Sequence, residues 1–338
     1  MNGNRISSSP TSRQTAIRGN NHRKSMSKNR KVSAPTKHSK KQYTTKSKHP
    51  SFIRTEEGND LIARAKRYLN GGYPVHFTGA SGTGKTALAM QVAAELNQPA
   101  TIIHGNHEMN NVDLIGGTTG WSSSKTIDNF VRQVYKQDAN VKENWTPGRL
   151  TEAVQHGHVL IYDEFSRSTP ETNNLFLSVL EEKLLPLYGT KQKQPSVAVH
   201  PNFKLILTSN PTEYAGVFQT QDALADRLIT LEINLSQQTK ETILRKSENL
   251  SEQESNTVWQ LIEQIEHETD DESVGLGLRA AFMIARIAKN SKASFSSEDS
   301  IFRQTCSDVL SSYLVRSGRS GTIQEAQNLI REILQDSH

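Results

Sequence analysis

A glycine-rich turn followed by a lysine and a threonine carries the strongest chemical signal in the chain. The phosphate-binding pattern G-x-x-x-x-G-K-[ST] is matched by Gly79, Ala80, Ser81, Gly82, Thr83, Gly84, Lys85 and Thr86. Glycines let the backbone wrap closely, so that successive N–H groups point at phosphate oxygens. The lysine adds a positive charge at the β- and γ-phosphates, and the threonine hydroxyl can ligate Mg²⁺. The turn therefore predicts a site for a nucleoside triphosphate with magnesium; the alternative is a glycine turn without a ligand.

An apolar run that ends in two carboxylates is the second strong signal. Residues 159–164 read Val-Leu-Ile-Tyr-Asp-Glu, which predicts a buried strand ending at Asp163 and Glu164. The carboxyl ends of parallel strands face the ligand crevice of an α/β sheet. We expect Asp163 to hold the magnesium, and Glu164 to orient and activate the attacking water. The alternative is a surface acidic pair that caps a strand.

An asparagine at the end of a third strand is expected to join these carboxylates. Asn210 follows the apolar run 203–208, so it should lie at the same sheet edge as Asp163. Its amide could fix the attacking water or the γ-phosphate. The alternative is a turn residue before Pro211, which is a common role for asparagine.

Two arginines complete the candidate site. Arg227 lies between a predicted helix, 222–227, and a predicted strand, 228–233, where it could project toward a neighbouring subunit. An arginine supplied there would neutralise charge that builds on the γ-phosphate; a surface pair with Asp226 is the alternative. Arg279 opens a helix after a glycine-rich turn, so it could reach a phosphate across a domain gap or be a plain surface arginine.

Alternating strands and helices are predicted around these residues. Apolar runs predict strands at 75–77, 100–103, 159–164, 203–208 and 228–233, and helical patterns occupy 55–70, 87–96, 150–156 and the stretch after Thr169. This alternation is typical of an α/β fold with a central parallel sheet. Residues 185–200 predict a β-hairpin with a basic tip at Lys191 and Lys193. The glycine-rich stretch 110–121 is too long for a simple connector and predicts an irregular functional loop.

Composition divides the chain into three predicted parts. Residues 1–50 lack periodic apolar positions and predict a disordered basic tail, which is either a tether to an acidic partner or a solvated extension. Residues 51–236 form the predicted α/β nucleotide-binding domain, and residues 237–338 a small all-α lid. Helices of the lid are expected at 252–268, 278–289, 297–315 and 322–334.

The bulk charge conceals a split between the tail and the remainder. The net charge of the 338-residue chain is +5, but residues 1–50 hold thirteen Lys or Arg and no acidic residue, so the remainder has a net charge of −8. Whole-chain charge is therefore no argument for specific nucleic-acid binding. The single cysteine, Cys306, fits a reducing compartment. No apolar run approaches the ~18 residues of a membrane span, and we expect a cytoplasmic protein.

The order of these features resembles that of the AAA+ ATPases: phosphate loop, Asp-Glu strand, hairpin, asparagine-ended strand, arginine and helical lid. The hairpin and the insert at 113–117 resemble the MoxR-like branch. Within that branch, residues 55–335 look like the gas vesicle protein N family, GvpN. The likeness rests on the segments Tyr-Asp-Glu-Phe-Ser-Arg-Ser (162–168), Glu-Thr-Asn-Asn-Leu (171–175), Leu-Glu-Glu-Lys (180–183), His-Pro-Asn-Phe (200–203) and Thr-Ser-Asn-Pro-Thr-Glu-Tyr-Ala-Gly-Val (208–217).

The resemblance implies an AAA+ ATPase that hydrolyses Mg-ATP to assist gas vesicle assembly or growth. It implies gas vesicle shell or accessory proteins as partners, a homo-oligomer such as a hexameric ring, and a gas vesicle-associated location in the cytoplasm. It assigns Lys85 and Thr86 to nucleotide and magnesium, Asp163 and Glu164 to metal and water, Asn210 as a sensor, Arg227 as a finger in trans, and Arg279 as a second sensor.

Three other functions remain open at this point. The chain could be a nucleotide-gated binding or scaffold protein with little required hydrolysis, because the same residues would serve either role. It could be a MoxR-type chaperone of another complex, against which the stretch 210–217 argues. A DNA- or RNA-linked ATPase is motivated only by the tail. Trp121 and the insert at 113–117 are candidates to grip a client, and a core position is the alternative for Trp121.

Overall fold

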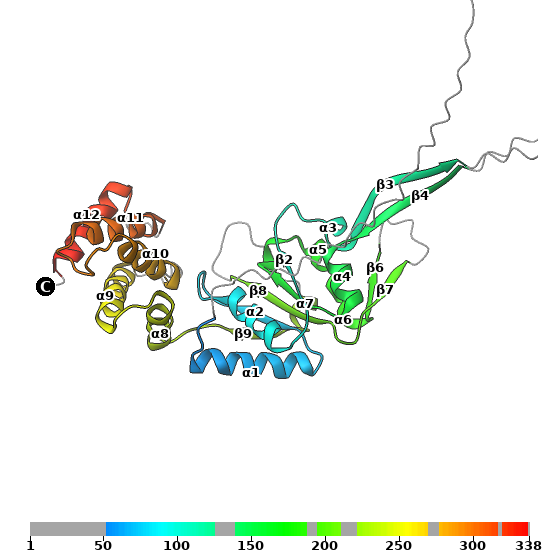
Figure 1. Ribbon diagram of the computed structural model, residues 1–338, viewed down its shortest axis with the longest axis horizontal. Coiled ribbons are helices and arrows are strands. Elements are labelled where there is room, and N and C mark those ends of the chain that lie inside the picture. The colour runs from blue at the N-terminus through cyan, green and yellow to red at the C-terminus, as the bar shows by residue number, and fades with distance from the viewer. Residues whose placement is uncertain are drawn as a thin grey trace, which may run out of the picture. The chain divides into compact units, whose positions relative to one another are not determined.

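The computed structural model describes residues 52–125, 139–187, 195–210, 222–269, 277–316 and 320–336 (Figure 1). The predicted tail, the hairpin tip with Lys191 and Lys193, and the family-like residues 211–217 lie outside these ranges, as does the side chain of Trp121. The helices and the short 3₁₀ turn that precede the C-terminal helical region are α1 Glu56–Asn70, α2 Lys85–Glu95, α3 Asn111–Ile115, α4 Arg149–His156, η1 Phe165–Arg167, α5 Pro170–Asn173, α6 Leu175–Glu181 and α7 Asp222–Ala225.

A five-stranded parallel sheet lies at the centre of the α/β part, as the alternation of strands and helices predicts. Its strands are, in spatial order, β2 Ala100–His104, β5 Val159–Asp163, β8 Lys204–Ser209, β1 Val75–Thr78 and β9 Ile229–Glu232. The central strands are continuous apolar runs because helices cover both faces of the sheet. The register pairs Thr78 with Ser209, and Tyr162 with Leu207. The phosphate loop after β1, the carboxylates after β5 and Asn210 after β8 therefore leave the sheet at one edge.

Alternate residues of each strand face two separate apolar cores. Val159 and Ile161 of β5 pack on the side of α1 and α2, whereas Leu160 and Tyr162 pack on the side of α4 and α6. Helix α1 begins at a side-chain cap, in which Thr55 accepts a hydrogen bond from the backbone of the first turn. The sheet is thus held from both faces, which fixes the strand ends that carry the candidate site.

Two antiparallel hairpins are added to this core. Strands β6 Leu184–Pro186 and β7 Ser196–Ala198 pair as the sequence predicts. The prediction of an irregular loop at 110–121 is wrong. This stretch contains α3 and the start of β3 Gly116–Lys125, and β3 pairs with β4 Ala139–Pro147 (Figure 1). The side chain of Asn110 caps α3 reciprocally with Asp113. The local cap and the distant partner strand explain why a glycine-rich stretch is regular here.

The C-terminal region is helical. Its helices are α8 Gln237–Glu248, α9 Glu252–Thr269, α10 Gly277–Asn290, α11 Ser300–Arg316 and α12 Ile323–Asp336. Apolar spacing predicts four helices in this region, and α8 is an additional helix that precedes them. Apolar residues of these helices belong to the same buried cluster as α1 and α2. Among the helices of the described residues, none combines the length and the apolar character needed to span a bilayer.

Candidate active site

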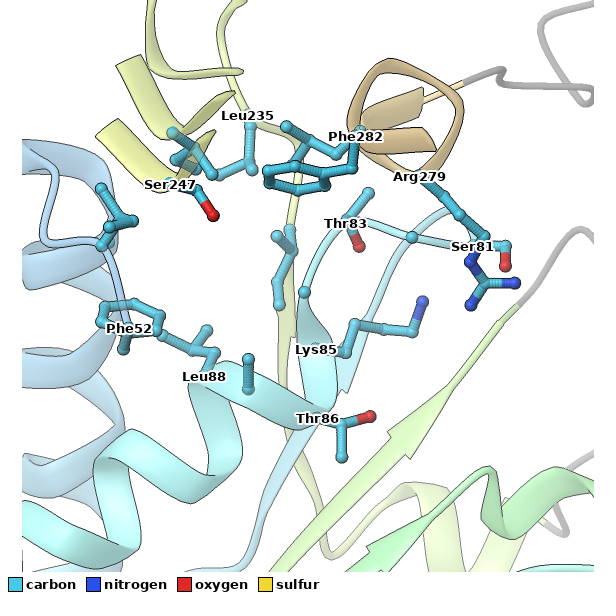
Figure 2. Close-up of a pocket in the computed structure, with 18 of the residues that line it drawn as sticks. Phe52, Ser81, Thr83, Lys85, Thr86, Leu88, Leu235, Ser247, Arg279 and Phe282 are labelled. Carbon is cyan, nitrogen blue, oxygen red and sulfur yellow. The ribbon is translucent and has the colours of Figure 1, made fainter. Parts of the chain in front are cut away.

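Most of the predicted site residues meet in one cavity of about 680 Å³ (Figure 2). Its polar lining comes from the phosphate loop, from the carboxyl ends of β5 and β8, and from the start of α10. The members of this polar lining that the sequence predicts are Ser81, Gly82, Thr83, Gly84, Lys85, Thr86, Asp163, Glu164, Asn210 and Arg279. Gly79 and Ala80 lie behind the lining, and Arg227 lies outside it. Residues that are more than a hundred positions apart in sequence therefore share one site.

The phosphate loop takes a conformation that its glycines permit. Gly79 and Gly84 have positive φ angles, 148° and 86°, which side-chain-bearing residues rarely adopt. A Cβ atom on Gly79 would also lie 2.7 Å from the carbonyl oxygen of Ile233. Helix α2 begins directly after the loop, so its positive end points toward the cavity. Lys85 is buried, and its Nζ donates to the carbonyl oxygens of Gly79 (2.8 Å) and Ala80 (2.7 Å).

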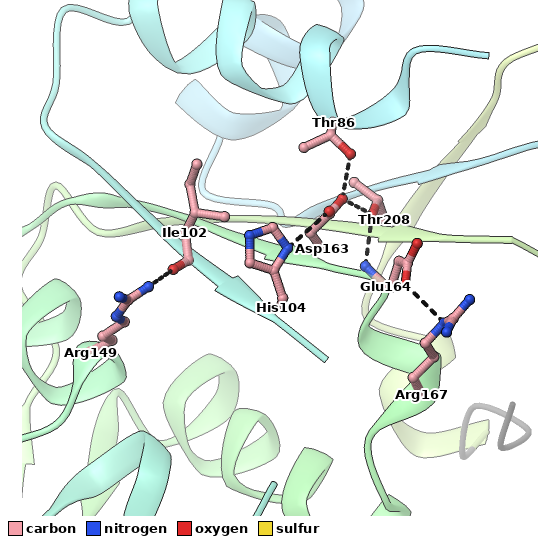
Figure 3. Close-up of polar contacts among 8 residues, drawn as sticks. All are labelled: Thr86, Ile102, His104, Arg149, Asp163, Glu164, Arg167 and Thr208. Atoms are coloured by element: carbon pink, nitrogen blue, oxygen red, sulfur yellow. Dashed lines mark hydrogen bonds and ion pairs between the residues drawn. The ribbon is translucent and has the colours of Figure 1, made fainter. Parts of the chain in front are cut away.

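Asp163 lies at the centre of a polar cluster (Figure 3). Its Oδ1 accepts hydrogen bonds from the hydroxyls of Thr86, at 2.6 Å, and Thr208, at 2.7 Å. Its Oδ2 lies 3.2 Å from Nδ1 of His104. The Thr86 hydroxyl and the Asp163 carboxylate thus present adjacent oxygens toward the cavity, and oxygen ligands are what Mg²⁺ prefers. These two residues fit a magnesium ion.

Glu164 stands in a strained backbone conformation at the end of β5. Its φ and ψ angles, 53° and 42°, are left-handed, an uncommon conformation for a residue with a side chain. Such strain often occurs at functional sites. Its backbone N–H donates to the Thr208 hydroxyl at 3.0 Å, and its Oε2 lies 2.8 Å from Nε of Arg167 (Figure 3). A Cβ on Gly105 would lie 2.2 Å from the Glu164 carbonyl oxygen, so only glycine fits beside this turn.

The remaining polar candidates occupy different places. Asn210 is buried and lines the cavity beyond the end of β8. Arg279 is exposed, and its Cβ lies 3.3 Å from the position that a Cβ on Gly82 would take, so the first turn of α10 approaches the phosphate loop closely. Arg227 contacts the Ala223 carbonyl and the Glu181 carboxylate instead of the cavity. Its role in a neighbouring subunit stays a prediction.

Sequence reasoning missed two components of the cavity. Thr208 bridges Asp163 to the Glu164 backbone, but it reads as an ordinary end of the apolar strand β8, so no local signal marks it. The other component is an apolar wall, which lines the same cavity as the polar cluster. Its members are Phe52, Ile53, Leu61, Leu235, Ile243, Phe282, Met283 and Ile287. Two aromatics, Phe52 and Phe282, are visible on this wall in Figure 2.

The parallel sheet, the phosphate loop and the carboxylate cluster define an AAA+ P-loop ATPase. A family model described as "AAA domain (dynein-related subfamily)" matches residues 74–228. The chain is 39% identical over 277 residues to the gas vesicle ATPase GvpN of Ancylobacter aquaticus, covering 82% of this chain and 77% of the relative. It is 36% identical to GvpN1 of Halobacterium salinarum, covering 84% and 81%, and 38% identical to GvpN of Haloferax mediterranei, covering 77% and 74%. The chain belongs to the gas vesicle ATPase GvpN family.

Proposed function

We propose that this chain hydrolyses Mg-ATP and uses the reaction to assist gas vesicle assembly or growth by acting on shell proteins. The observation that carries the proposal is the convergence of Lys85, Asp163 and Asn210 on one cavity in a chain of the GvpN family. Each of these residues lies at or beyond the carboxyl end of a different strand of the sheet. The client is proposed from the names of the relatives.

In the proposed reaction the phosphate loop and Lys85 hold the β- and γ-phosphates. Thr86 and Asp163 would hold magnesium, which supplies positive charge to the phosphate oxygens when bound. Glu164 accepts a proton from water as the water oxygen bonds to the γ-phosphorus. The bond from that phosphorus to the bridging oxygen of ADP breaks, and ADP and phosphate leave. Asn210 and Arg279 are proposed to contact the water or the γ-phosphate.

The apolar wall is suited to the nucleobase. A flat, weakly hydrated ring gains from contact with aromatic and aliphatic side chains such as Phe282 and Ile243. The base at that wall and the phosphates at the loop would occupy different parts of the same cavity. This division supports a nucleotide as the ligand, over a small inorganic phosphate.

Arg227 is proposed to act on the site of a neighbouring subunit in a homo-oligomer. Its side chain is 33% exposed, lies outside its own cavity and pairs with Glu181 of α6. An arginine that reaches a γ-phosphate from a neighbour can raise the rate by ~10³–10⁵. Catalysis that depends on protein concentration, and that is restored by mixing Arg227→Ala with Lys85→Ala subunits, would support this arrangement.

The test replaces the proposed general base with its neutral isostere. Glu164→Gln should lower ATP turnover by about 100-fold or more, because general-base catalysis contributes ~10²–10⁴, while nucleotide binding persists. Glu263→Gln, an exposed change on α9 away from the cavity, is the matched control. Unchanged turnover in Glu164→Gln would remove the assigned role of that carboxylate.

The same variant separates a working motor from a nucleotide-gated scaffold. Cells whose gas vesicles depend on this chain should fail to grow normal vesicles when it carries Glu164→Gln. Normal vesicle growth together with lost turnover would instead show that binding suffices and that hydrolysis is incidental.

A further inference from the structure

A histidine in the strand before the phosphate loop contacts the elements that carry the catalytic residues. His76 lies in β1 between Val75 and Phe77, both of which are completely buried. Its Nε2 lies 2.8 Å from Oγ of Ser209 on β8, and its Nδ1 lies 3.1 Å from Oγ1 of Thr230 on β9. One imidazole therefore joins three neighbouring strands through hydrogen bonds.

The same ring also packs edge-on against Phe165. The ring centroids are 5.3 Å apart and the planes are at 89°, a favourable T-shaped arrangement. Phe165 directly follows Glu164, and Ser209 directly precedes Asn210. His76 itself lies three residues before the start of the phosphate loop. The ring thus contacts the immediate neighbours of two predicted catalytic residues without lining the cavity itself.

His76 makes these contacts as a neutral ring. Burial lowers its pKa to about 4, because the charged imidazolium loses hydration. A neutral imidazole has one N–H donor and one acceptor. Serine and threonine hydroxyls can donate or accept, so both hydrogen bonds are compatible with either tautomer. The buried Ser209 hydroxyl would lose this partner if an apolar side chain replaced the histidine.

We propose that His76 is a positioning residue of the hydrolysis site, which fixes Asn210 and Glu164 relative to the phosphate loop through Ser209 and Phe165. The inference rests on the proposed hydrolysis and deepens it. Displacements of about 1 Å in a catalytic geometry can cost ~10²-fold in rate. Because His76 does not line the cavity, its loss should affect kcat far more than nucleotide affinity.

The experiment measures kcat, the KM for ATP and the melting temperature of full-length variants. His76→Phe keeps a ring but loses both hydrogen bonds, and we expect kcat to fall about 10- to 100-fold with KM within about threefold. Ser209→Ala removes one hydroxyl with little effect on folding and should lower kcat in the same direction. The kcat of the double variant should be no lower than that of His76→Phe alone, since both substitutions remove the same hydrogen bond between His76 and Ser209. His76→Gln, which keeps an amide donor and acceptor, should recover part of kcat.

Thr230→Ala is the matched control. It removes the other hydrogen-bond partner of His76, and no predicted catalytic residue lies at the carboxyl end of the strand that carries Thr230. Its kcat should stay near that of the unsubstituted chain. The proposal is overturned if Ser209→Ala and His76→Phe keep normal kcat, if their effects add in the double variant, or if kcat falls only in proportion to lost folded protein. Glu164→Gln distinguishes the failures: if it also leaves turnover unchanged, the proposed hydrolysis chemistry fails, whereas a large loss there with none at His76 overturns only the positioning role.

Discussion

The two walls of the cavity are built in different ways. The polar wall comes mainly from three short stretches at the carboxyl ends of strands of one sheet, and some of its residues contact one another directly, as Thr86 contacts Asp163. The apolar wall is assembled from α1 and the segment before it, the segment after β9, and helices α8 and α10. Its residues are ordinary apolar side chains without a characteristic spacing. The difference indicates that local motifs specify the polar groups, whereas tertiary packing specifies the apolar surface that is proposed to hold the base.

We expect substitutions on the two walls to change different kinetic parameters. Groups that face the γ-phosphate interact with charge that changes during the reaction, so they should influence kcat. Groups that face the base contact an unchanging part of the ligand, so they should influence affinity alone. Substitutions on the two walls can therefore test the comparison directly.

The largest effect is expected at Lys85 on the polar wall. Lys85→Ala removes the charge at the β- and γ-phosphates, and a charge-assisted hydrogen bond of this kind is worth enough to weaken nucleotide binding by about 100-fold. Turnover should become undetectable. Binding of a fluorescent ATP analogue and phosphate release are the measurements, with Lys246→Ala on the exposed face of α8 as the control. Normal turnover in Lys85→Ala would show that the loop is no phosphate site.

The polar wall was also the part that could be predicted from sequence. The positive φ angles at positions 79 and 84 favour glycine, and the lysine follows these glycines at a fixed spacing. The sequence pattern alone therefore predicts the conformation of the loop. The strands that lead to Asp163 and Asn210 are largely continuous apolar runs because the sheet is covered on both faces. The apolar wall, Thr208 and the β3–β4 hairpin depend on partners distant in sequence. Periodicity within one segment contains no information about those partners.

Acid should destabilise the folded chain through His76, the neutral ring that is proposed to support the polar wall. The pKa of His76 is lowered from 6.5 to about 4 in the folded chain, so between these values the unfolded chain binds the extra proton and stability falls as pH falls. At pH 5 the loss attributable to His76 is about 2 kcal/mol relative to pH 7.5. Urea unfolding at both pH values, compared with His76→Phe, isolates this contribution from that of other histidines. Equal pH dependence in both proteins would contradict it.

On the apolar wall, Phe282→Ala should weaken binding without slowing the reaction. An aromatic contact is worth about 0.5–1.5 kcal/mol beyond its buried area, so we expect the KM for ATP to rise about tenfold while kcat stays within about twofold. Phe295→Ala is a matched control, since Phe295 is partly buried in the same helical region but packs on Phe302 instead of lining the cavity. A fall in kcat with unchanged KM in Phe282→Ala would contradict the proposal that the apolar wall affects only nucleotide affinity.

The smallest effect is expected from Arg167, which reaches the polar wall from outside the cavity. In the proposed reaction Arg167 would compete with the attacking water for the carboxylate of Glu164. The side chains of Arg167 and Glu164 are 39% and 47% exposed, however, and exposed ion pairs are worth only about 0.2–1 kcal/mol. Arg167→Ala should therefore raise kcat by no more than about fivefold, and high salt should reduce the difference because it screens the pair.

Arg245→Ala, which breaks a more exposed pair with Glu252 on the helical region, should leave kcat unchanged. A rate that falls in Arg167→Ala would show that the guanidinium orients Glu164 productively instead of competing for it. Either direction of change would mean that the polar wall is shaped partly by residues that never line the cavity, as proposed for His76. The apolar wall contains no strained carboxylate whose orientation an outside residue could set, so an equivalent dependence is not expected there.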